Sequence, residues 1–229
     1  KMYARGINDS ALVRGDDRYL HIVSCNTHNI SVLIKTLAMD PDGTNHLVDG
    51  RFLCIRRAND ISQDEGFVAS PTVDKHKDER FGTHHARDAH QLFATLGYDL
   101  DLYSSSLKLN TQYMHSIHFS LTLDQEMTLD EAKERLMSNP RVAVTYKRSA
   151  NQVFSFGRDH GYYGRILSQT VVALDTLAVR NGNELVGFCF TPQDGNPLLS
   201  TVAAMLWYLD PDTVDTRIDI LRRYILREV

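Results

Sequence analysis

The stretch TVVALDTLAVRNGNELVGFCFT, residues 170–191, restricts the fold more than any other part of the sequence. Two runs rich in β-branched, aliphatic and aromatic residues flank the dipeptide Asn181-Gly182. Both of these residues readily adopt the positive φ angles of a tight hairpin turn. The stretch therefore predicts two antiparallel strands joined at residues 181–182.

Further strands are predicted over residues 21–24, 50–58, 113–123 and 141–147. The third of these runs alternates in polarity, and successive side chains of a strand point to opposite faces of the sheet. His115 therefore shares the better covered face with Ile117, whereas His118 lies on the other face.

Helices are predicted where apolar residues recur at helical spacing. One such set, at i, i+3, i+4 and i+7, is Ile30, Leu33, Ile34 and Leu37. Thr128 and Glu131 have the spacing of a capping box, which predicts a helix that runs to about Met137. Two more helices are expected, one after Pro197 and one over residues 213–229.

Strands and helices are mixed along the chain with few strand–helix–strand repeats. This order predicts an α+β fold, with a largely antiparallel mixed sheet and helices on one face. We expect one domain over residues 1–229, with the C-terminal helix at 213–229. From Asn59 to about Arg87 the chain is polar, and we expect a long loop of the kind that often carries function.

Charge and composition exclude several kinds of partner. The formal net charge is −4 and the pI is near 6.2, so no broad basic surface for nucleic acid is expected. No stretch reaches the roughly 20 apolar residues of a membrane span, and the polar start does not resemble a signal peptide. We therefore expect a cytoplasmic protein that binds neither nucleic acid nor a membrane.

The three cysteines are Cys25, Cys54 and Cys189, and they show no CxxC spacing. This argues against a disulfide framework and against a zinc site, and no HExxH motif is present. We predict no metal site. Cys54 and Cys189 lie inside apolar runs and are expected in the core.

Cys25 stands where the predicted strand at 21–24 meets the helix that follows it. The unpaired N–H groups and the dipole of a helix N-terminus favour a thiolate, and they can hold an oxyanion formed on a carbonyl bonded to that sulfur. From these residues alone two interpretations stay open: an activated nucleophile, or a small buried residue that closes a strand.

A nucleophilic cysteine needs a base, and either His115 or His118 is a candidate, although each is also compatible with a structural histidine. Other side chains suit a phosphate or carboxylate. These are Arg56, Arg57, Thr83, His84 and His85. Surface ion pairs and an ordinary polar loop are the alternatives for them.

The order of the motifs SCNT, IRRA, THHARD, MHSIH and RVAVTYK, followed by the Asn-Gly hairpin, resembles the catalytic domain of archaeal-type (class II) glyceraldehyde-3-phosphate dehydrogenase. The similarity extends from about Tyr19 to Trp207. Each motif alone is weak, and their order and spacing carry the resemblance.

The resemblance implies that Cys25 attacks an aldehyde to form a thiohemiacetal, with His115 as base and His118 as the reserve. The family segment reads Met-His-x-His, whereas this chain has Met-His-Ser-Ile-His at 114–118. The resemblance further implies a substrate and phosphate pocket made by Asn26, Thr27, Arg56, Arg57, Thr83, His84 and His85.

The resemblance also implies partners. They are NAD or NADP, inorganic phosphate as co-substrate, a small phosphorylated aldehyde, and copies of the same chain in a homotetramer. In the family the cofactor is bound mainly by a Rossmann domain with a GxGxxG fingerprint, and we expect that domain to be absent from this chain. His28 and Asn29 are bulkier than the residues that usually follow the cysteine motif.

Two alternatives remain. One is a non-catalytic binding or structural module that retains the fold. The other is a related semialdehyde or sugar-phosphate dehydrogenase, which shares the cysteine-thioester chemistry. The paired arginines and the Thr-His-His segment favour the phosphosugar enzyme over the semialdehyde enzyme.

Overall fold

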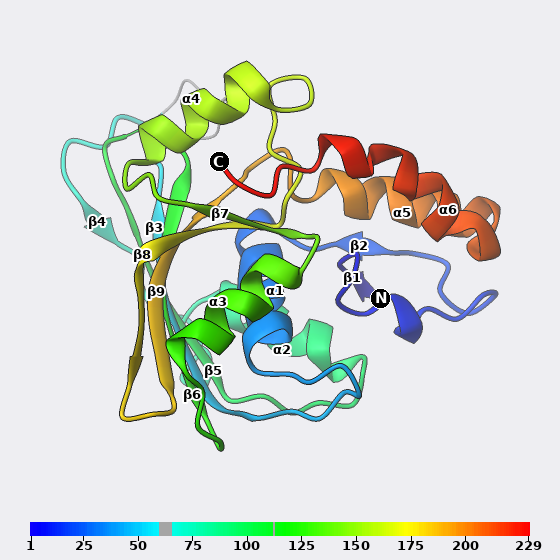
Figure 1. The fold of residues 1–229 in the computed structure, drawn as a ribbon, viewed down its shortest axis with the longest axis horizontal. Coiled ribbons are helices and arrows are strands. Elements are labelled where there is room, and N and C mark those ends of the chain that lie inside the picture. The colour runs from blue at the N-terminus through cyan, green and yellow to red at the C-terminus, as the bar shows by residue number, and fades with distance from the viewer. Residues whose placement is uncertain (60–65, 112) are drawn as a thin grey trace.

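The computed structural model describes residues 1–59, 66–111 and 113–229. Its main sheet has seven strands within this part of the chain: β3 (Leu47–Arg56), β4 (Thr72–Val73), β5 (Leu102–Lys108), β6 (His115–Leu123), β7 (Val142–Thr145), β8 (Thr170–Arg180) and β9 (Glu184–Thr191). Their order is β4-β5-β3-β6-β9-β8-β7. β3 pairs with β5 and β7 with β8 in parallel, and the other neighbours are antiparallel. The predicted largely antiparallel mixed sheet is confirmed (Figure 1).

The turn between β8 and β9 has the backbone that its sequence requires. Asn181 has φ 52° and Gly182 has φ 80°, both in the left-handed region. A Cβ atom added at Gly182 would lie 3.7 Å from Glu126, which is an ordinary contact. The positive φ angle, and not a lack of space, therefore favours glycine at this position.

Three helices cover one face of the sheet: α1 (Cys25–Leu37), α2 (His84–Ala94) and α3 (Leu129–Ser138). Their apolar side chains form the main core with the inward side chains of the strands, including Leu33 of α1, Leu92 of α2 and Phe119 of β6. The α+β fold is confirmed. A fourth helix, α4 (Ala150–His160), packs on the opposite face at one end, where Val153 joins a second core cluster with Phe190.

The two ends of the chain lie beside the sheet, as Figure 1 shows. β1 (Met2–Tyr3) and β2 (His21–Ile22) form a small parallel pair. They pack below α5 (Leu198–Leu209) and the short helix α6 (Val214–Ile218), where Tyr3 joins an apolar cluster with Ala203. The terminal segments also contain three short 3-10 helices: η1 (Asp9–Ala11), η2 (Pro211–Thr213) and η3 (Asp219–Tyr224).

The C-terminal segment differs from the single helix expected over 213–229. η2 ends at Thr213, the first residue of this range, α6 ends at Ile218, and η3 continues to Tyr224. The tail is then extended, because its backbone binds the sheet: Val144 of β7 donates to the carbonyl of Arg227, and Val229 donates to the carbonyl of Val144.

The long loop expected over residues 59–87 is shorter than predicted. Residues 60–65 lie outside the described part of the chain, but α2 begins at His84, within the predicted loop. No helix among the described residues combines the length and the apolar character needed to cross a bilayer.

Candidate active site

Cys25 is the first residue of α1, as the sequence predicted. Ser24 is extended and caps the helix, since its Oγ accepts a hydrogen bond from the Thr27 N–H at 3.3 Å. Cys25 is half-buried and carries a thiol, whereas Cys54 and Cys189 are fully buried. Among the three cysteines, Cys25 is thus the one that a reagent in solvent reaches most readily.

Buried polar side chains fasten the first turn of α1 to the end of β9. Thr191 donates its hydroxyl to Asn26 Oδ1 at 3.1 Å and accepts a hydrogen bond from Asn29 Nδ2 at 2.8 Å. Asn196, after β9, donates to the carbonyl oxygen of Cys25 at 2.8 Å. Asn196 therefore holds the backbone of Cys25, while Thr191 holds the side chains of Asn26 and Asn29.

His115 begins β6 directly beside Thr191 of β9 in the sheet register. It lies on the face that α1 covers, with 6% of its surface exposed. Its Nδ1 accepts a hydrogen bond from the backbone N–H of Arg57 at 2.9 Å. A neutral His115 in this arrangement carries its proton on Nε2 and can donate it from there.

His118 lies on the other face of the sheet, because it is three positions after His115 along β6 and side chains alternate between the faces. Its ring packs edge-on against Phe188, with the ring centroids 4.9 Å apart. The structure therefore places His115, and not His118, on the same side of the sheet as Cys25 and α1.

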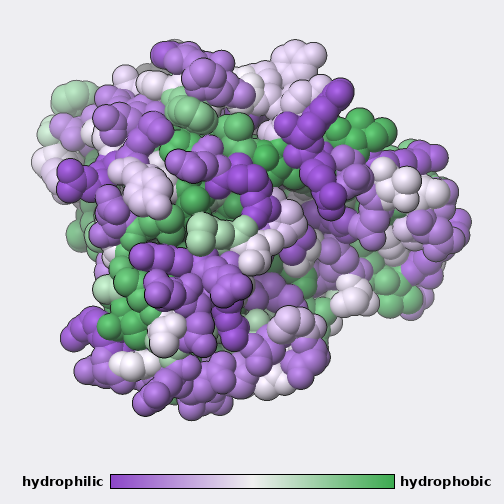
Figure 2. All heavy atoms as spheres, viewed as in Figure 1, coloured by the Kyte–Doolittle hydropathy of each residue, from purple (hydrophilic) through white to green (hydrophobic). Residues whose placement is uncertain are grey.

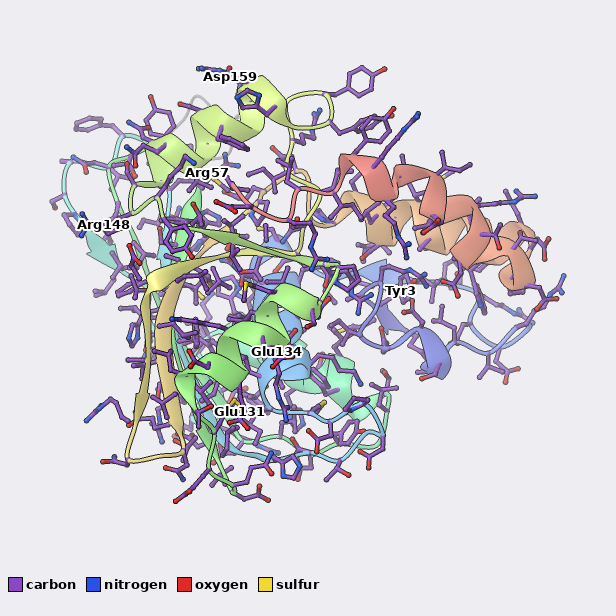
Figure 3. All side chains as sticks on the ribbon, in the orientation of Figure 1. Tyr3, Arg57, Glu131, Glu134, Arg148 and Asp159 are labelled. Atoms are coloured by element: carbon purple, nitrogen blue, oxygen red, sulfur yellow. The ribbon has the colours of Figure 1, made fainter. Side chains whose placement is uncertain are left out.

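The two arginines at the end of β3 have different surroundings. Arg56 Nη1 donates to Asp74 at 3.2 Å, and the side chain is partly exposed. The Arg57 side chain is buried and lines a small cavity with Phe154 of α4. Figure 3 shows Arg57 between the sheet and α4. The expected pair is thus divided between two environments.

Thr83, His84 and His85 stand at the N-terminus of α2, which rests on β5. The hydroxyl groups of Thr83 and Ser104 lie 2.6 Å apart, and Ser104 also accepts the Ala86 N–H at 3.0 Å. The rings of His84 and His85 are in contact, with centroids 3.9 Å apart and the ring planes tilted by 45°.

His85 is a buried imidazole next to several positive groups. Burial, followed by the charges of His84, Arg56 and His115, lowers its pKa to about 3. Neither ring nitrogen has a hydrogen-bond partner among the described residues. A neutral ring without a partner, beside Arg56, is suited to donate to an anion.

Two of the expected pocket residues point inward. Asn26 and Thr27 are buried, and Thr27 binds the helix cap while Asn26 binds Thr191. His28 and Asn29 are also buried: His28 Nδ1 lies 3.0 Å from the Ser24 carbonyl, and its Nε2 lies 2.8 Å from Ser200 Oγ. These side chains support the first turn of α1.

Sequence reasoning missed Thr191 and Asn196 as parts of this site. Nothing in the strand that ends at Thr191, or in the loop that contains Asn196, marks them, because their role depends on contacts with α1. Among the described residues, no group of three His, Cys, Asp or Glu side chains is arranged to hold a metal ion.

Comparison with known proteins agrees with the motif order. No family model matches the sequence. The glyceraldehyde-3-phosphate dehydrogenase of Metallosphaera sedula is 27% identical over 175 residues, which cover 74% of this chain and 48% of that protein. This chain carries a region distantly related to archaeal glyceraldehyde-3-phosphate dehydrogenases. The glyceraldehyde-3-phosphate dehydrogenase of Pyrobaculum islandicum is 24% identical over 172 residues, 73% of this chain and 47% of that protein.

The chain spans about half the length of these two glyceraldehyde-3-phosphate dehydrogenases. The sheet described here does not have the form that binds dinucleotides, in which consecutive parallel strands surround a glycine-rich turn. Its two parallel pairs, β5–β3 and β8–β7, are separated by the antiparallel strands β6 and β9. The described residues thus do not fit a nicotinamide dinucleotide by themselves.

Proposed function

We propose that this chain is the catalytic part of a phosphorylating, NAD(P)-dependent aldehyde dehydrogenase that resembles glyceraldehyde-3-phosphate dehydrogenase. One observation carries the proposal. Cys25 opens a capped 13-residue helix whose first turn is hydrogen-bonded to Thr191, the strand neighbour of His115. The nucleophile and the proton-handling residue therefore come from different elements that meet at one end of the sheet.

Cys25 acts as a thiolate that attacks the aldehyde carbon. A C–S bond forms, and the carbonyl oxygen becomes an alkoxide. The N–H groups at the start of α1 stabilise both the thiolate and the alkoxide. His115 donates a hydrogen bond from Nε2 to this oxygen, and it can take up a proton at Nδ1 only when the Arg57 contact opens.

Phosphate groups of the substrate, and inorganic phosphate as co-substrate, bind near Arg56, His84 and His85, with Thr83 fixing the start of α2. Two features support this assignment. The positive charge of Arg56 lies close to the two adjacent histidine rings, and the buried ring of His85 has no hydrogen-bond partner among the described residues. Arg57 contributes through its backbone N–H, which orients His115.

The oxidation step needs a hydride acceptor, NAD or NADP in this family. Because the described residues do not fit a dinucleotide, we assign no part of that step to them. A nucleotide-binding domain in the same protein or in a partner would supply the acceptor.

We also propose that the chain forms a homo-oligomer, a tetramer by analogy with the family, through the sheet face that carries His118. Phe188 on this face is 39% exposed. In Figure 2 one group of hydrophobic side chains lies on the left, where β8 and β9 run, and other groups lie in the upper middle and on the right of the same view. Such an apolar region favours contact with another copy.

The acyl-transfer half of the reaction can be tested without a nicotinamide. When acetyl phosphate is added, Cys25 should form a thioester and phosphate should leave, and peptide mass mapping should find the acetyl group on Cys25. Cys25→Ser should abolish this label. His115→Gln should slow it by about 10²-fold or more, whereas His118→Gln, the matched change on the opposite face, should stay within about twofold.

Absence of acylation at Cys25 in the folded chain would contradict the enzyme proposal. It would favour the second candidate, a binding module that retains the fold. The observation that favours this alternative is a sheet that does not match a dinucleotide-binding fold. Equal effects of the two histidine variants would also remove His115 from the mechanism.

A further inference from the structure

A second cavity contains none of the residues assigned to catalysis in its lining. It has a volume of about 580 Å³, which is within the range of small-molecule sites. The N-terminal segment, the start of β7 and the C-terminal helices surround it. Its charged lining residues are Arg5, Arg141, Asp215, Asp219, Arg222 and Arg227. We call it the arginine cavity.

The arginine cavity has an excess of two positive charges, since four arginines face two aspartates. Both aspartates are already engaged, Asp215 by Arg5 and Asp219 by Arg222. Arg141 and Arg227 have no carboxylate within 4 Å among the described residues. Arg227 Nη2 donates to the neutral carbonyl oxygen of Met137, so neither guanidinium group has an anionic partner within 4 Å among the described residues.

Arg141 is fixed in place without a counter-ion. Its guanidinium packs on the backbone of Gly6, whose φ of 78° and lack of a side chain permit this approach. Nη2 donates to the Gly6 carbonyl at 3.4 Å, a long contact. Asp9 is the acidic group that acts on Arg141, but its oxygens accept hydrogen bonds from Tyr3 and the Gly6 N–H.

Two buried polar atoms beside the cavity also have no hydrogen-bond partner among the described residues, Arg141 Nε and Gln169 Oε1. A buried charge and unsatisfied polar atoms both cost free energy, and a bound oxyanion would offset part of that cost. Burial lowers the pKa of Arg141, which agrees with this cost.

The rest of the lining is apolar, with Leu199, Ile218 and Ile225 on one side. A ligand that satisfies both parts has a dianionic group and an apolar body. Guanidinium groups bind phosphate in a bidentate manner, and a phosphate monoester carries a charge of about −1.5 to −2 near pH 7. We propose that the arginine cavity binds a small organic phosphate, with Arg141 on the phosphate and the apolar wall against its body.

Binding can be measured by isothermal titration calorimetry of the 229-residue chain with phenyl phosphate and adenosine monophosphate as probes. We expect one site for at least one probe. Three control compounds should bind at least tenfold more weakly. Phenol and adenosine lack the phosphate group, and inorganic phosphate lacks the apolar body. Arg141→Gln should weaken the probe at least tenfold.

Two further variants test whether the probe binds in the arginine cavity and not at another exposed arginine. Arg222→Gln changes an exposed residue of the cavity and should weaken binding even if Arg141→Gln does not fold. Arg158→Gln, on α4, removes an exposed arginine that is also paired with an aspartate, and it should have no effect.

Arg56→Gln separates this proposal from the candidate active site, and probe binding should survive that change. Absence of binding by both probes would overturn the proposal. So would loss of probe binding in Arg56→Gln alone, or inorganic phosphate binding as tightly as the probes to the Arg56→Gln variant, in which the candidate active site is weakened. The proposed function would stand or fall separately, because acylation of Cys25 does not use the arginine cavity.

Discussion

At the scale of single residues, the three cysteines differ in burial and therefore in the pKa of their thiols. Burial raises the pKa of Cys189 to about 12, and burial raises the pKa of Cys54 further still. Cys54, Ile117 and Cys189 occupy one row across β3, β6 and β9 in the covered face of the sheet. Cys25 is half-buried at the helix N-terminus.

This contrast predicts the order of alkylation. In the folded protein at pH 8, iodoacetamide should modify Cys25, while Cys54 and Cys189 should react only after the sheet unfolds. Peptide mass mapping with and without urea measures this directly. Modification of Cys54 or Cys189 at the rate of Cys25 in the native protein would show that the core is open to the reagent.

Because His28 is buried, we expect the free energy of unfolding to decrease in acid. Burial lowers its pKa from 6.5 to about 4 in the folded protein. Between these two values the unfolded chain binds a proton that the native chain does not, so stability falls as the pH falls from 6.5 to 4. The shift corresponds to at most about 3 kcal/mol. His85, whose pKa is also lowered, acts in the same direction.

The free energy of unfolding from urea titrations at pH 7, 5.5 and 4 provides the measurement. His28→Gln should make stability less dependent on pH over this range, whatever its effect at pH 7. An unchanged slope in the variant would mean that His28 is already protonated in the native state, or that it is accessible to solvent.

Thr191 is predicted to be a positioning residue for the first turn of α1. Thr191→Val keeps the shape but removes the hydroxyl that links Asn26 and Asn29, and should destabilise the protein by about 1–3 kcal/mol. It should also slow acylation of Cys25. Thr191→Ser retains the hydroxyl and should restore both quantities; a rate that does not recover would rule out this role.

Among the elements, α3 has the clearest local determinant. Thr128 Oγ1 accepts the Glu131 N–H at 3.2 Å, and the Glu131 carboxylate accepts the Thr128 N–H at 2.7 Å, which forms a complete capping box. The sequence predicted this helix start from two residues because the interaction is local.

Thr128→Ala should lower the free energy of unfolding by about 1 kcal/mol, since the Glu131 N–H at the helix start loses its side-chain acceptor. Thr128→Ser is the matched control and should cost less than half as much. Urea denaturation gives both values, and an alanine variant as stable as the parent would show that water replaces the cap without loss.

The sequence did not predict β5 or α4, and the same physical reason explains both omissions. The covered side of β5 carries Ser104 and Ser106, which are buried because they bind Thr83 and Asp74, so no apolar alternation marks the strand. α4 contains Gly157, a poor helix former, because a side chain there would collide with Ile166. Tertiary contacts determine these elements, and local patterns do not show them.

The candidate site, like the fold, was predicted where local patterns determine it and was not predicted where tertiary contacts do. Cys25 was found because a strand-to-helix junction is a local signal, and strand alternation separated His115 from His118. The division between Arg56 and Arg57 was not predicted, since it depends on Asp74 and α4. Whether these residues act as the resemblance implies stays a prediction.

At the scale of the whole molecule, the uncovered sheet face predicts self-association. Phe188→Glu places a charge on this face and should convert an oligomer into smaller species, as measured by light scattering after size-exclusion chromatography. Phe67→Glu, at a phenylalanine 94% exposed elsewhere, is the matched control and should change nothing. A monomeric parent protein, or equal effects of both changes, would refute this interface.

The central place of β6 has a consequence for how the chain folds. β6 pairs with β3 on one side and β9 on the other, and both partners are distant in sequence: Ile55 meets Ser116, and Thr122 meets Glu184. Long loops must therefore close before the middle of the sheet gains its contacts, which slows folding. During synthesis, β6 leaves the ribosome well before β9 exists, and until then one edge of β6 stays unpaired and open to aggregation.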